Sequence, residues 1–388
     1  MSSRSRLIVL LISGPVIAFV LIGGALTNAV ARDDSYQPLR MFQDVTSLIV
    51  NNYVEKVNVG SVIGGAMRGL AFGLDPDSAY LTPPEVEEIE AHAPLPPAGI
   101  GVTLTRQYYL RIIAARDGSP AALAGLHTGD FIRDIDGKST RELSVWEGIH
   151  ELRGQPGTTV KLTIIRGNAA DPHDLTLTRI VAPRPTVTGR LESPGVGYLK
   201  VPGFDDDAAA EITREVKDLQ KQGATRLAID LRGSATGALA NGLKAARLFV
   251  ASGTLGYKES RNGPRETISA SAGDGRLAMP VVLLVDPGTS GAAELFAAAL
   301  AGNHRAELVG ERTDGRAAEQ TLVKLSDGSG LWLSTTQYLT PSGAPIDERG
   351  LLPDVGVAEP FYHFGDTPPP GDPILDKALA VLAATHAA

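Results

Sequence analysis

The chain has 388 residues, and its 36 Lys and Arg against 44 Asp and Glu give a formal charge of −8. This acidic balance argues against nucleic acid as the main partner. The sequence contains no Cys, which excludes disulfides, thiolate nucleophiles, zinc–thiolate sites and iron–sulfur clusters. With 43% hydrophobic residues, 43 Gly and 26 Pro, the composition predicts a folded chain of two or three domains with many turns.

The N-terminal 32 residues contain the most apolar stretch of the chain. Twenty uncharged residues, Leu7 to Leu26, follow the basic residues Arg4 and Arg6, and as a helix they would span about 30 Å of hydrocarbon. We therefore expect residues 1–32 to form a membrane anchor or signal segment and the rest of the chain to be extracytoplasmic. Ala29-Val30-Ala31 has the small-x-small form of a signal peptidase site, so cleavage stays an alternative to an uncleaved anchor.

Residues 40–93 are predicted to form a small helical cap. Apolar residues recur at helical spacing in two runs, and the turn sequence Leu74-Asp75-Pro76-Asp77-Ser78 follows the second run. The proline-rich stretch Pro94-Leu95-Pro96-Pro97 then predicts a stiff linker and a domain boundary.

Residues 98–182 alternate short β-rich runs with turn signals and two short helical stretches. The order of Gly99-Ile100-Gly101-Val102, Gly118-Ser119-Pro120-Ala121 and Gly129-Asp130-Phe131-Ile132 resembles a PDZ domain. The resemblance implies that Gly99, Ile100, Gly101 and Val102 form a loop whose backbone N–H groups bind the terminal carboxylate of a peptide. The expected partners are therefore protein or peptide C-termini.

Residues 190–360 are predicted to form an α/β domain. The continuous apolar runs Ala228–Leu231 and Val281–Val285 are typical of strands that helices cover on both faces. Active sites of such sheets lie at the carboxyl ends of the strands. The places to search are therefore Arg232–Gly237 and Asp286–Glu294.

Three ordered motifs resemble the C-terminal-processing, or tail-specific, serine peptidases. Leu74-Asp75-Pro76-Asp77-Ser78-Ala79-Tyr80-Leu81 is similar to the family's LDPHSxYL, and Asp230-Leu231-Arg232 followed by Gly237 is similar to its DLRNNPGG. Thr340-Pro341-Ser342-Gly343-Ala344-Pro345-Ile346-Asp347 is similar to the start of its TPSGxxIxxxGIxPD.

The resemblance implies a multidomain α/β fold. It consists of an N-terminal helical segment, a β-rich PDZ domain placed before a crotonase-like, tail-specific peptidase core, and a tail over residues 361–388 that we expect to be helical from residue 373. The family's chemistry uses side chains and water alone, so the resemblance implies neither a cofactor nor a metal.

The catalytic segments depart from the family pattern at both reacting groups. The family's nucleophilic Ser lies three residues before the Glu of GTASASE, and that position is Gly291 here, with Ser290 one residue too early. A displacement of one residue at a helix entrance rotates a side chain by roughly 100°, so Ser290 is a doubtful nucleophile. The family's general-base Lys corresponds to Arg316, whose guanidinium stays protonated.

Other parts of the family site are kept or partly kept. Gln320 falls where the family has the Gln that supports its Ser and Lys. The PGG of the oxyanion loop reads Ala235-Thr236-Gly237, so Thr236, Gly237 and Ala292 are the candidate backbone donors to an oxyanion.

Two functions are compatible with these residues. The first is an anchored, extracytoplasmic serine endopeptidase that captures protein C-termini and uses Ser290 as a displaced nucleophile. The second is a non-catalytic relative that retains peptide capture and acts as an adaptor, decoy or regulator. The substitutions at positions 291 and 316 favour the second. The membrane is an expected partner through the N-terminal segment, and the sequence predicts no particular oligomeric state.

Overall fold

A computed structural model describes residues 36–167 and 172–384, so the anchor predicted over residues 1–32 lies outside the described residues. The chain divides into two compact units, Met1–Gly69 and Leu70–Ala388. In the first unit, residues 36–52 are helical and helix α2 (Val59–Phe72) begins. Among the residues described, no helix is long and apolar enough to cross a membrane.

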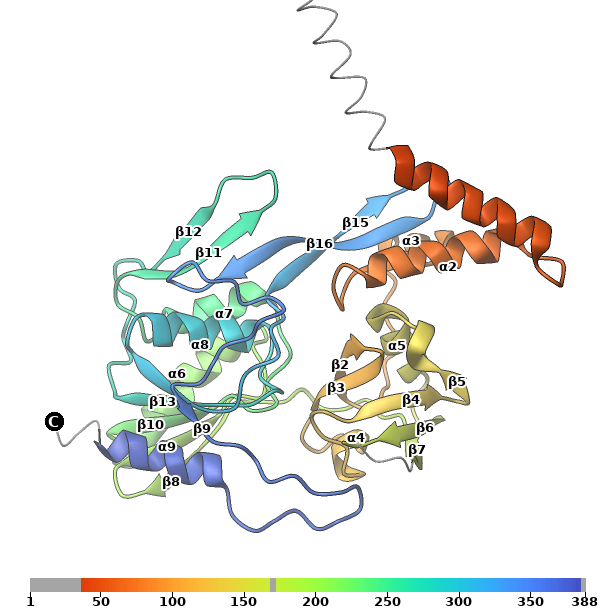
Figure 1. Cartoon of the computed structure of the whole chain (residues 1–388). Helices are drawn as coiled ribbons and strands as arrows, with labels where there is room; N and C mark the ends of the chain where they lie inside the picture. Colours follow the sequence, from red (N-terminus) through yellow and green to blue (C-terminus); the bar gives the residue numbers. More distant parts are fainter. Residues whose placement is uncertain (1–35, 168–171, 385–388) are drawn as a thin grey trace, which may run out of the picture. The chain divides into compact units, whose positions relative to one another are not determined.

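The core of the second unit is a six-stranded sheet in the order β17-β14-β13-β10-β9-β8 (Figure 1). Five strands are parallel, and the edge strand β8 is antiparallel to β9. The strand bounds are β8 Thr188–Ser193, β9 Val196–Lys200, β10 Arg226–Asp230, β13 Val281–Val285, β14 Ala306–Gly310 and β17 Val355–Gly356.

Helices cover both faces of this sheet, as the apolar runs predict. Ile229 and Leu283 pack toward α6 (Ala208–Lys221), α7 (Leu239–Ala246) and α8 (Ala292–Gly302). On the opposite face, Ala228 and Leu284 pack against α9 (Pro373–Ala384). Because side chains alternate between the faces of a strand, a sheet buried on both sides needs apolar residues at successive positions. The predicted α/β fold class is thus confirmed.

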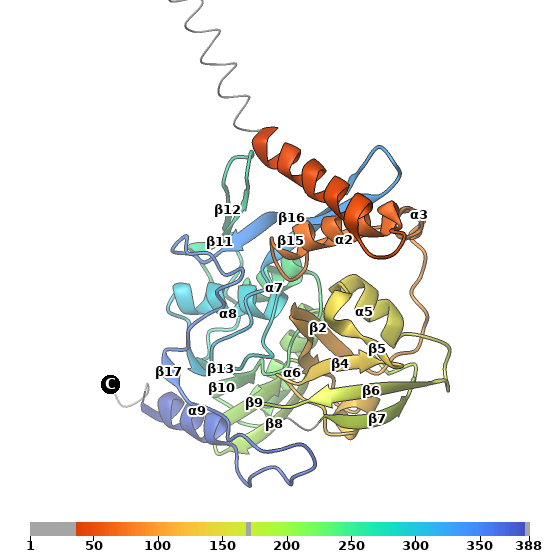
Figure 2. The same ribbon diagram turned by 45° about the vertical axis from the view of Figure 1, so that its right-hand side comes forward.

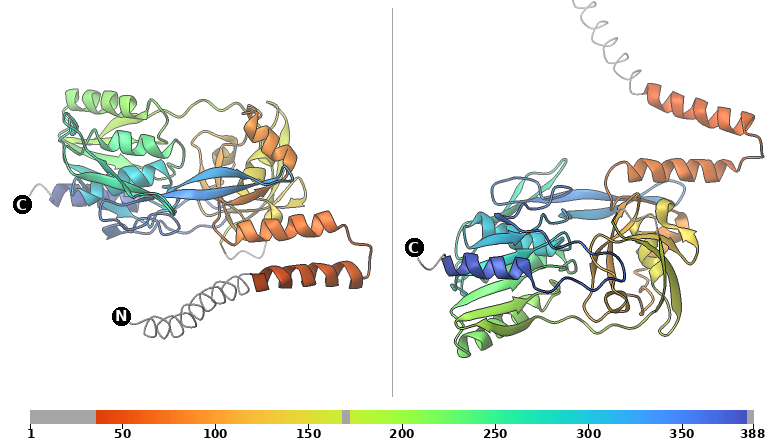
Figure 3. Two further views of the ribbon diagram at one scale, coloured as in Figure 1. Left: turned by 90° about the horizontal axis from the view of Figure 1, so that it is seen from above. Right: turned by 60° about the horizontal axis from the view of Figure 1, so that its bottom comes forward.

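A second, antiparallel sheet was not predicted from the sequence. Its path is β1-β16-β11-β12, with β15 also paired to β16, and Figure 3 shows β15 and β16 as a long two-stranded ribbon. Its bounds are β1 Ala79–Leu81, β11 Thr254–Ser260, β12 Glu266–Ser269, β15 Ala318–Lys324 and β16 Gly330–Leu339. The three-residue strand β1 follows the turn at 74–78 and precedes α3 (Pro83–Glu90), so the segment predicted as a helical cap also contains a strand.

The β-rich domain contains a sheet in the order β2-β3-β4-β6-β7, with β5 paired to β4 (Figure 2). Helix α5 lies beside β2, and the Ser144–Glu147 capping box fixes its first turn. The bounds are β2 Val102–Gln107, β3 Tyr109–Ala115, α4 Pro120–Leu123, β4 Phe131–Ile135, β5 Lys138–Ser139, η1 Thr140–Glu142, α5 Val145–Leu152, β6 Thr159–Ile165 and β7 His173–Thr178.

The connection from β17 to α9 links the two domains of the second unit. Its Phe364 stacks on His173 with ring centroids 4.8 Å apart, and the Arg166 guanidinium lies 4.9 Å from the Phe364 ring centre. The chain then returns to the core, where Asp372 accepts two hydrogen bonds from Arg232 at 2.7 and 2.8 Å. These contacts fix the β-rich domain and the α/β core to each other on the side away from α5.

Candidate active site

The turn between β13 and α8 places Gly291 at the position of the predicted nucleophile. Gly291 has φ 64° and ψ −117°, a left-handed conformation that side chains of L-residues rarely adopt. Such a sharp strand-to-helix turn is the conformation that exposes a nucleophilic Ser in other hydrolases. A Cβ added here would lie 3.6 Å from its nearest neighbours, the Arg316 carbonyl oxygen and Leu239. The backbone of a nucleophile turn and the space for a side chain are both present, but the hydroxyl is not.

Ser290, the alternative nucleophile, is buried and lies under this turn. The residue is 2% exposed, and its amide donates to the Ser234 carbonyl at 3.0 Å. Within residues 36–167 and 172–384, its hydroxyl has no hydrogen-bond partner and it does not line the cavity described below. No base is therefore hydrogen-bonded to Ser290 in the described part of the chain.

Glu294 connects the turn to the loop that carries Arg316. This fully buried carboxylate accepts four hydrogen bonds, at 2.9 Å from the Gly291 amide, 2.7 Å from the Gly315 amide, 2.9 Å from the Arg316 amide, and a short one from the Thr313 hydroxyl. Burial raises the pKa of Glu294 to about 7, against the opposing effect of these donors. Glu294 thus has a structural role: it holds positions 291 and 316 at a fixed separation.

The Arg316 side chain is bound on two sides. Its Nε and Nη2 donate to the two carboxylate oxygens of Asp77, at 2.8 Å for Nε, and Nη1 donates to the Leu104 carbonyl at 3.1 Å. Asp77 is oriented by Asp75, whose side chain accepts from the amides of Asp77 and Ser78. Arg316 therefore links the turn at 74–78, the edge strand β2 and the α/β core.

Arg316 cannot accept a proton in this environment. Burial lowers the pKa of its guanidinium, but the carboxylates of Asp77, Asp314 and Glu294 together raise it by more, so that the pKa lies above its ordinary value. A bidentate carboxylate–guanidinium pair also fixes the side chain in one orientation. The position that holds the general base in the family's pattern holds a permanent cation here.

No hydrogen bond joins Gln320 to Arg316. Its amide nitrogen donates to Ser334 on the neighbouring strand β16 at 3.2 Å and to the Ala318 carbonyl at 3.3 Å.

In the predicted oxyanion loop, the amides of Thr236 and Gly237 donate to no acceptor in the described part of the chain. Gly237 has φ 108°, and an added Cβ would lie 2.1 Å from the Phe204 carbonyl oxygen, so only Gly fits. The backbone donors of the oxyanion loop are thus available although its PGG sequence has changed.

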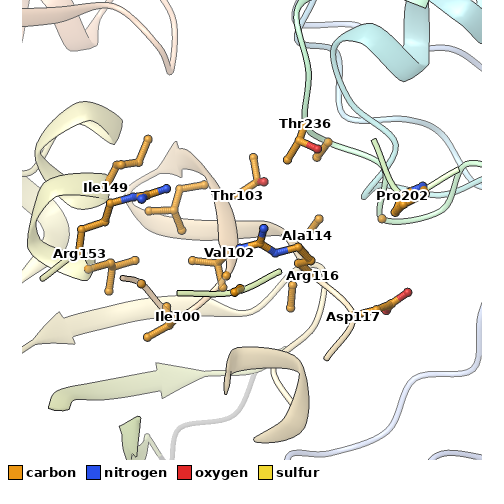
Figure 4. Close-up of a pocket in the computed structure, with 18 of the residues that line it drawn as sticks. Ile100, Val102, Thr103, Ala114, Arg116, Asp117, Ile149, Arg153, Pro202 and Thr236 are labelled. Atoms are coloured by element: carbon orange, nitrogen blue, oxygen red, sulfur yellow. The ribbon is translucent and has the colours of Figure 1, made fainter. Parts of the chain in front are cut away.

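A cavity of about 560 Å³ runs between the β-rich domain and this loop (Figure 4). Its apolar lining comes from β2, the preceding loop and α5, and comprises Ile100, Val102, Leu104, Val145, Ile149 and Leu152. At its other end lie Thr236, Gly237 and the Arg316 side chain. Figure 4 labels Arg116 among the residues that line this cavity, together with Val102 and Pro202.

Two contacts of the candidate site were not predicted from the sequence. Asp77 stands where the LDPHSxYL motif has His, and its carboxylate pairs with Arg316, which stands at the position of the family's general-base Lys. This double substitution is the signal that could have revealed the ion pair. The contact with the Leu104 carbonyl involves only backbone on one side and leaves no signal in the sequence.

Comparisons with known proteins agree with this architecture. The profile of peptidase family S41 matches residues 195–357, and that of a PDZ domain matches residues 111–166. The chain is 34% identical over 315 residues to a carboxyl-terminal-processing protease of Synechocystis sp., covering 79% of this chain and 74% of that protein. It is 31% identical over 317 residues to the carboxy-terminal processing protease CtpA of Bacillus subtilis, covering 81% and 68%.

The chain belongs to peptidase family S41. A solved structure of this family, the photosystem II D1 C-terminal processing protease, matches with a TM-score of 0.68 and 26% identity, over 82% of this chain and 92% of that one. The resemblance to C-terminal-processing serine peptidases and the presence of a PDZ domain are therefore confirmed. From here we call the β-rich domain the PDZ domain.

The raised pKa of Glu294 predicts a pH dependence of stability. The native carboxyl binds its proton more tightly than the unfolded chain does, so its contribution to stability is full below pH 4.5 and falls as the pH rises toward 7. Glu294→Gln lacks this titration, and it is less stable at every pH because its side-chain amide faces backbone N–H donors. We expect the difference in free energy of unfolding between the wild type and Glu294→Gln to shrink by roughly 1–3 kcal/mol between pH 5 and pH 8.

Urea unfolding of both proteins at the two pH values measures this difference. An advantage that grows with pH would mean that the four donors outweigh burial and that the pKa is lowered instead.

Proposed function

We propose that this family member binds protein C-termini without hydrolysing them. The observation that carries the proposal is the pair of substitutions in the catalytic site. Gly291 provides no hydroxyl at the nucleophile turn, and Arg316 is held by Asp77 in place of a neutral amine. Acyl transfer by a serine nucleophile needs both groups. The buried Ser290 gives no support to the alternative of a displaced nucleophile.

Three features of the PDZ domain support peptide capture. Strand β2 is an edge strand that pairs only with β3 in the described sheet, so a peptide can add beside it. The amides of Ile100 and Gly101 donate to no acceptor among the described residues, which leaves them for a carboxylate. The apolar cavity wall between β2 and α5 suits an aliphatic C-terminal side chain.

Arg116 supplies a cation beside the same loop. One of its guanidinium nitrogens lies 3.6 Å from the position of a Cβ built on Gly101. Its guanidinium forms no hydrogen bond or ion pair within the ranges that the structure describes. An unpaired guanidinium next to two free amides is a favourable environment for a carboxylate.

The apolar segment Leu7–Leu26 supports an extracytoplasmic location, with the chain either anchored by this segment or exported through it. The proposed role is therefore that of an adaptor, decoy or regulator that holds exposed protein tails on the outer side of a membrane. The peptide ligand contributes its terminal carboxylate and its last few residues.

Peptide binding is tested with a fluorescent eight-residue peptide that ends in Val-Ala-Leu. We expect the whole chain to bind the free acid at least tenfold more tightly than the C-terminal amide, because the amide removes the charge that Ile100, Gly101 and Arg116 face. Arg116→Gln should weaken binding of the acid about fivefold and leave binding of the amide unchanged. Arg133→Gln, at an exposed position on β4, is the matched control. Equal affinities for acid and amide would contradict carboxylate capture.

Absence of hydrolysis is tested with unfolded casein and a series of variants. We expect no cleavage by the wild type or by Ser290→Ala. The triple variant Asp77→His, Gly291→Ser and Arg316→Lys should gain activity, because position 291 has room for a side chain and already has the backbone of a nucleophile turn. The double variant that retains Asp77 should gain less, since a neighbouring carboxylate keeps a lysine protonated.

Cleavage by the wild type that Ser290→Ala abolishes would overturn the proposal. A triple variant that folds, as judged by an unchanged circular dichroism spectrum, but stays inactive would show that more than these three positions separates the chain from an active peptidase.

A further inference from the structure

The free edge of β2 is partly occupied by Arg316. In the β2–β3 pairing, Leu104 lies opposite Ile112. Both backbone groups of Ile112 are used on its other side, since its N–H donates to the Asp130 carbonyl at 2.8 Å and its C=O accepts from the Gly129 amide at 2.9 Å. In an antiparallel pair, the residue opposite such a position also directs its N–H and C=O away from the partner strand. The Leu104 carbonyl therefore points to the open edge, where Arg316 Nη1 donates to it at 3.1 Å.

An added peptide would need the same carbonyl. With the terminal carboxylate on the Ile100 and Gly101 amides, the last residue of an antiparallel peptide lies opposite Val102. One-to-one pairing then places the third residue from the end opposite Leu104, with its N–H directed at the Leu104 carbonyl. The guanidinium and the peptide amide thus compete for one acceptor, and the charged donor forms the stronger bond.

We propose that Arg316 determines specificity in peptide binding by restricting strand addition to the last two residues of the ligand. This inference rests on the proposed function, because it presumes that C-termini bind along β2. Asp77 holds two guanidinium nitrogens, so the third remains directed at Leu104 in the free protein. Recognition of longer tails then requires that Arg316 release this carbonyl. Arg316, at the position of the family's general base, would then select which tails bind by their length and sequence, and would take no part in cleaving a peptide bond.

Arg316→Lys is the informative variant. An ammonium group can still pair with Asp77, but it lacks the planar fork that places a third donor on Leu104. We therefore expect the whole chain with this substitution to bind the eight-residue peptide ending in Val-Ala-Leu about tenfold more tightly than the wild type does. Arg133→Lys serves as the control at an exposed position.

A peptide with an ester at the competing position makes the test specific. Replacing the amide N–H of the third residue from the end by oxygen removes the donor for Leu104 and leaves the carboxylate and the last side chain intact. We expect this change to cost less than twofold in the wild type, where Arg316 occupies the carbonyl, and about tenfold in Arg316→Lys. Thermal unfolding of each protein establishes that the variant is folded, and Arg316→Gln is measured in parallel in case the lysine protein unfolds.

The outcomes separate this inference from the proposed function. If both proteins prefer the free acid to the C-terminal amide but show the same cost for the ester, peptide capture stands and competition by Arg316 is overturned. If the ester weakens binding tenfold in the wild type alone, the Leu104 carbonyl is free in solution and the inference is again wrong. If neither protein distinguishes acid from amide, the proposed function fails, and this inference fails with it.

Discussion

The ion pair between Arg316 and Asp77 is the interaction on which the organisation of this site depends. It joins two residues that are 239 positions apart in the chain, and it leaves a third guanidinium nitrogen to bind the PDZ edge strand. The exposed fractions of the two side chains are 24% and 14%, so water screens the pair only in part. Hydrogen bonds to charged groups of this kind are each worth about 2 kcal/mol. One side chain thus connects the turn at 74–78, the PDZ domain and the catalytic loop.

The turn between β13 and α8 has the backbone of a nucleophile turn although position 291 is a glycine. Gly291 has a left-handed conformation, and Glu294 holds its amide together with those of Gly315 and Arg316. Helices α7 and α8 also pack closely at this turn, because a Cβ on Gly242 would overlap the Ala292 carbonyl oxygen. Packing and buried hydrogen bonds therefore determine this backbone conformation, and a nucleophilic side chain is not needed to form it. Under the proposed function, this backbone is retained without the reacting groups because its shape does not depend on them.

Much of the architecture could be predicted from the sequence, for identifiable physical reasons. The apolar run of β13 and the glycine-rich order of the PDZ domain are strong local signals, and counting from Glu294 placed the substitution at Gly291. The sheet that contains β15 and β16 was missed because most residues of these two strands are only partly buried, so that their sequences lack a strict alternation of apolar and polar positions. The Asp77 contact was missed because it depends on tertiary structure, and the Leu104 contact because it uses a backbone carbonyl. Local patterns revealed the elements and the substituted positions, but not which of them meet.

The central claim is that no serine in this site acts as a nucleophile, and reaction of the whole purified chain with a fluorophosphonate tests it most directly. Such reagents form a covalent bond only with an activated hydroxyl. Intact-mass measurement should show an unchanged protein, because Gly291 has no hydroxyl and the hydroxyl of the buried Ser290 has no hydrogen-bond partner among the described residues. Stoichiometric labelling that peptide mapping assigns to Ser290 would contradict the account.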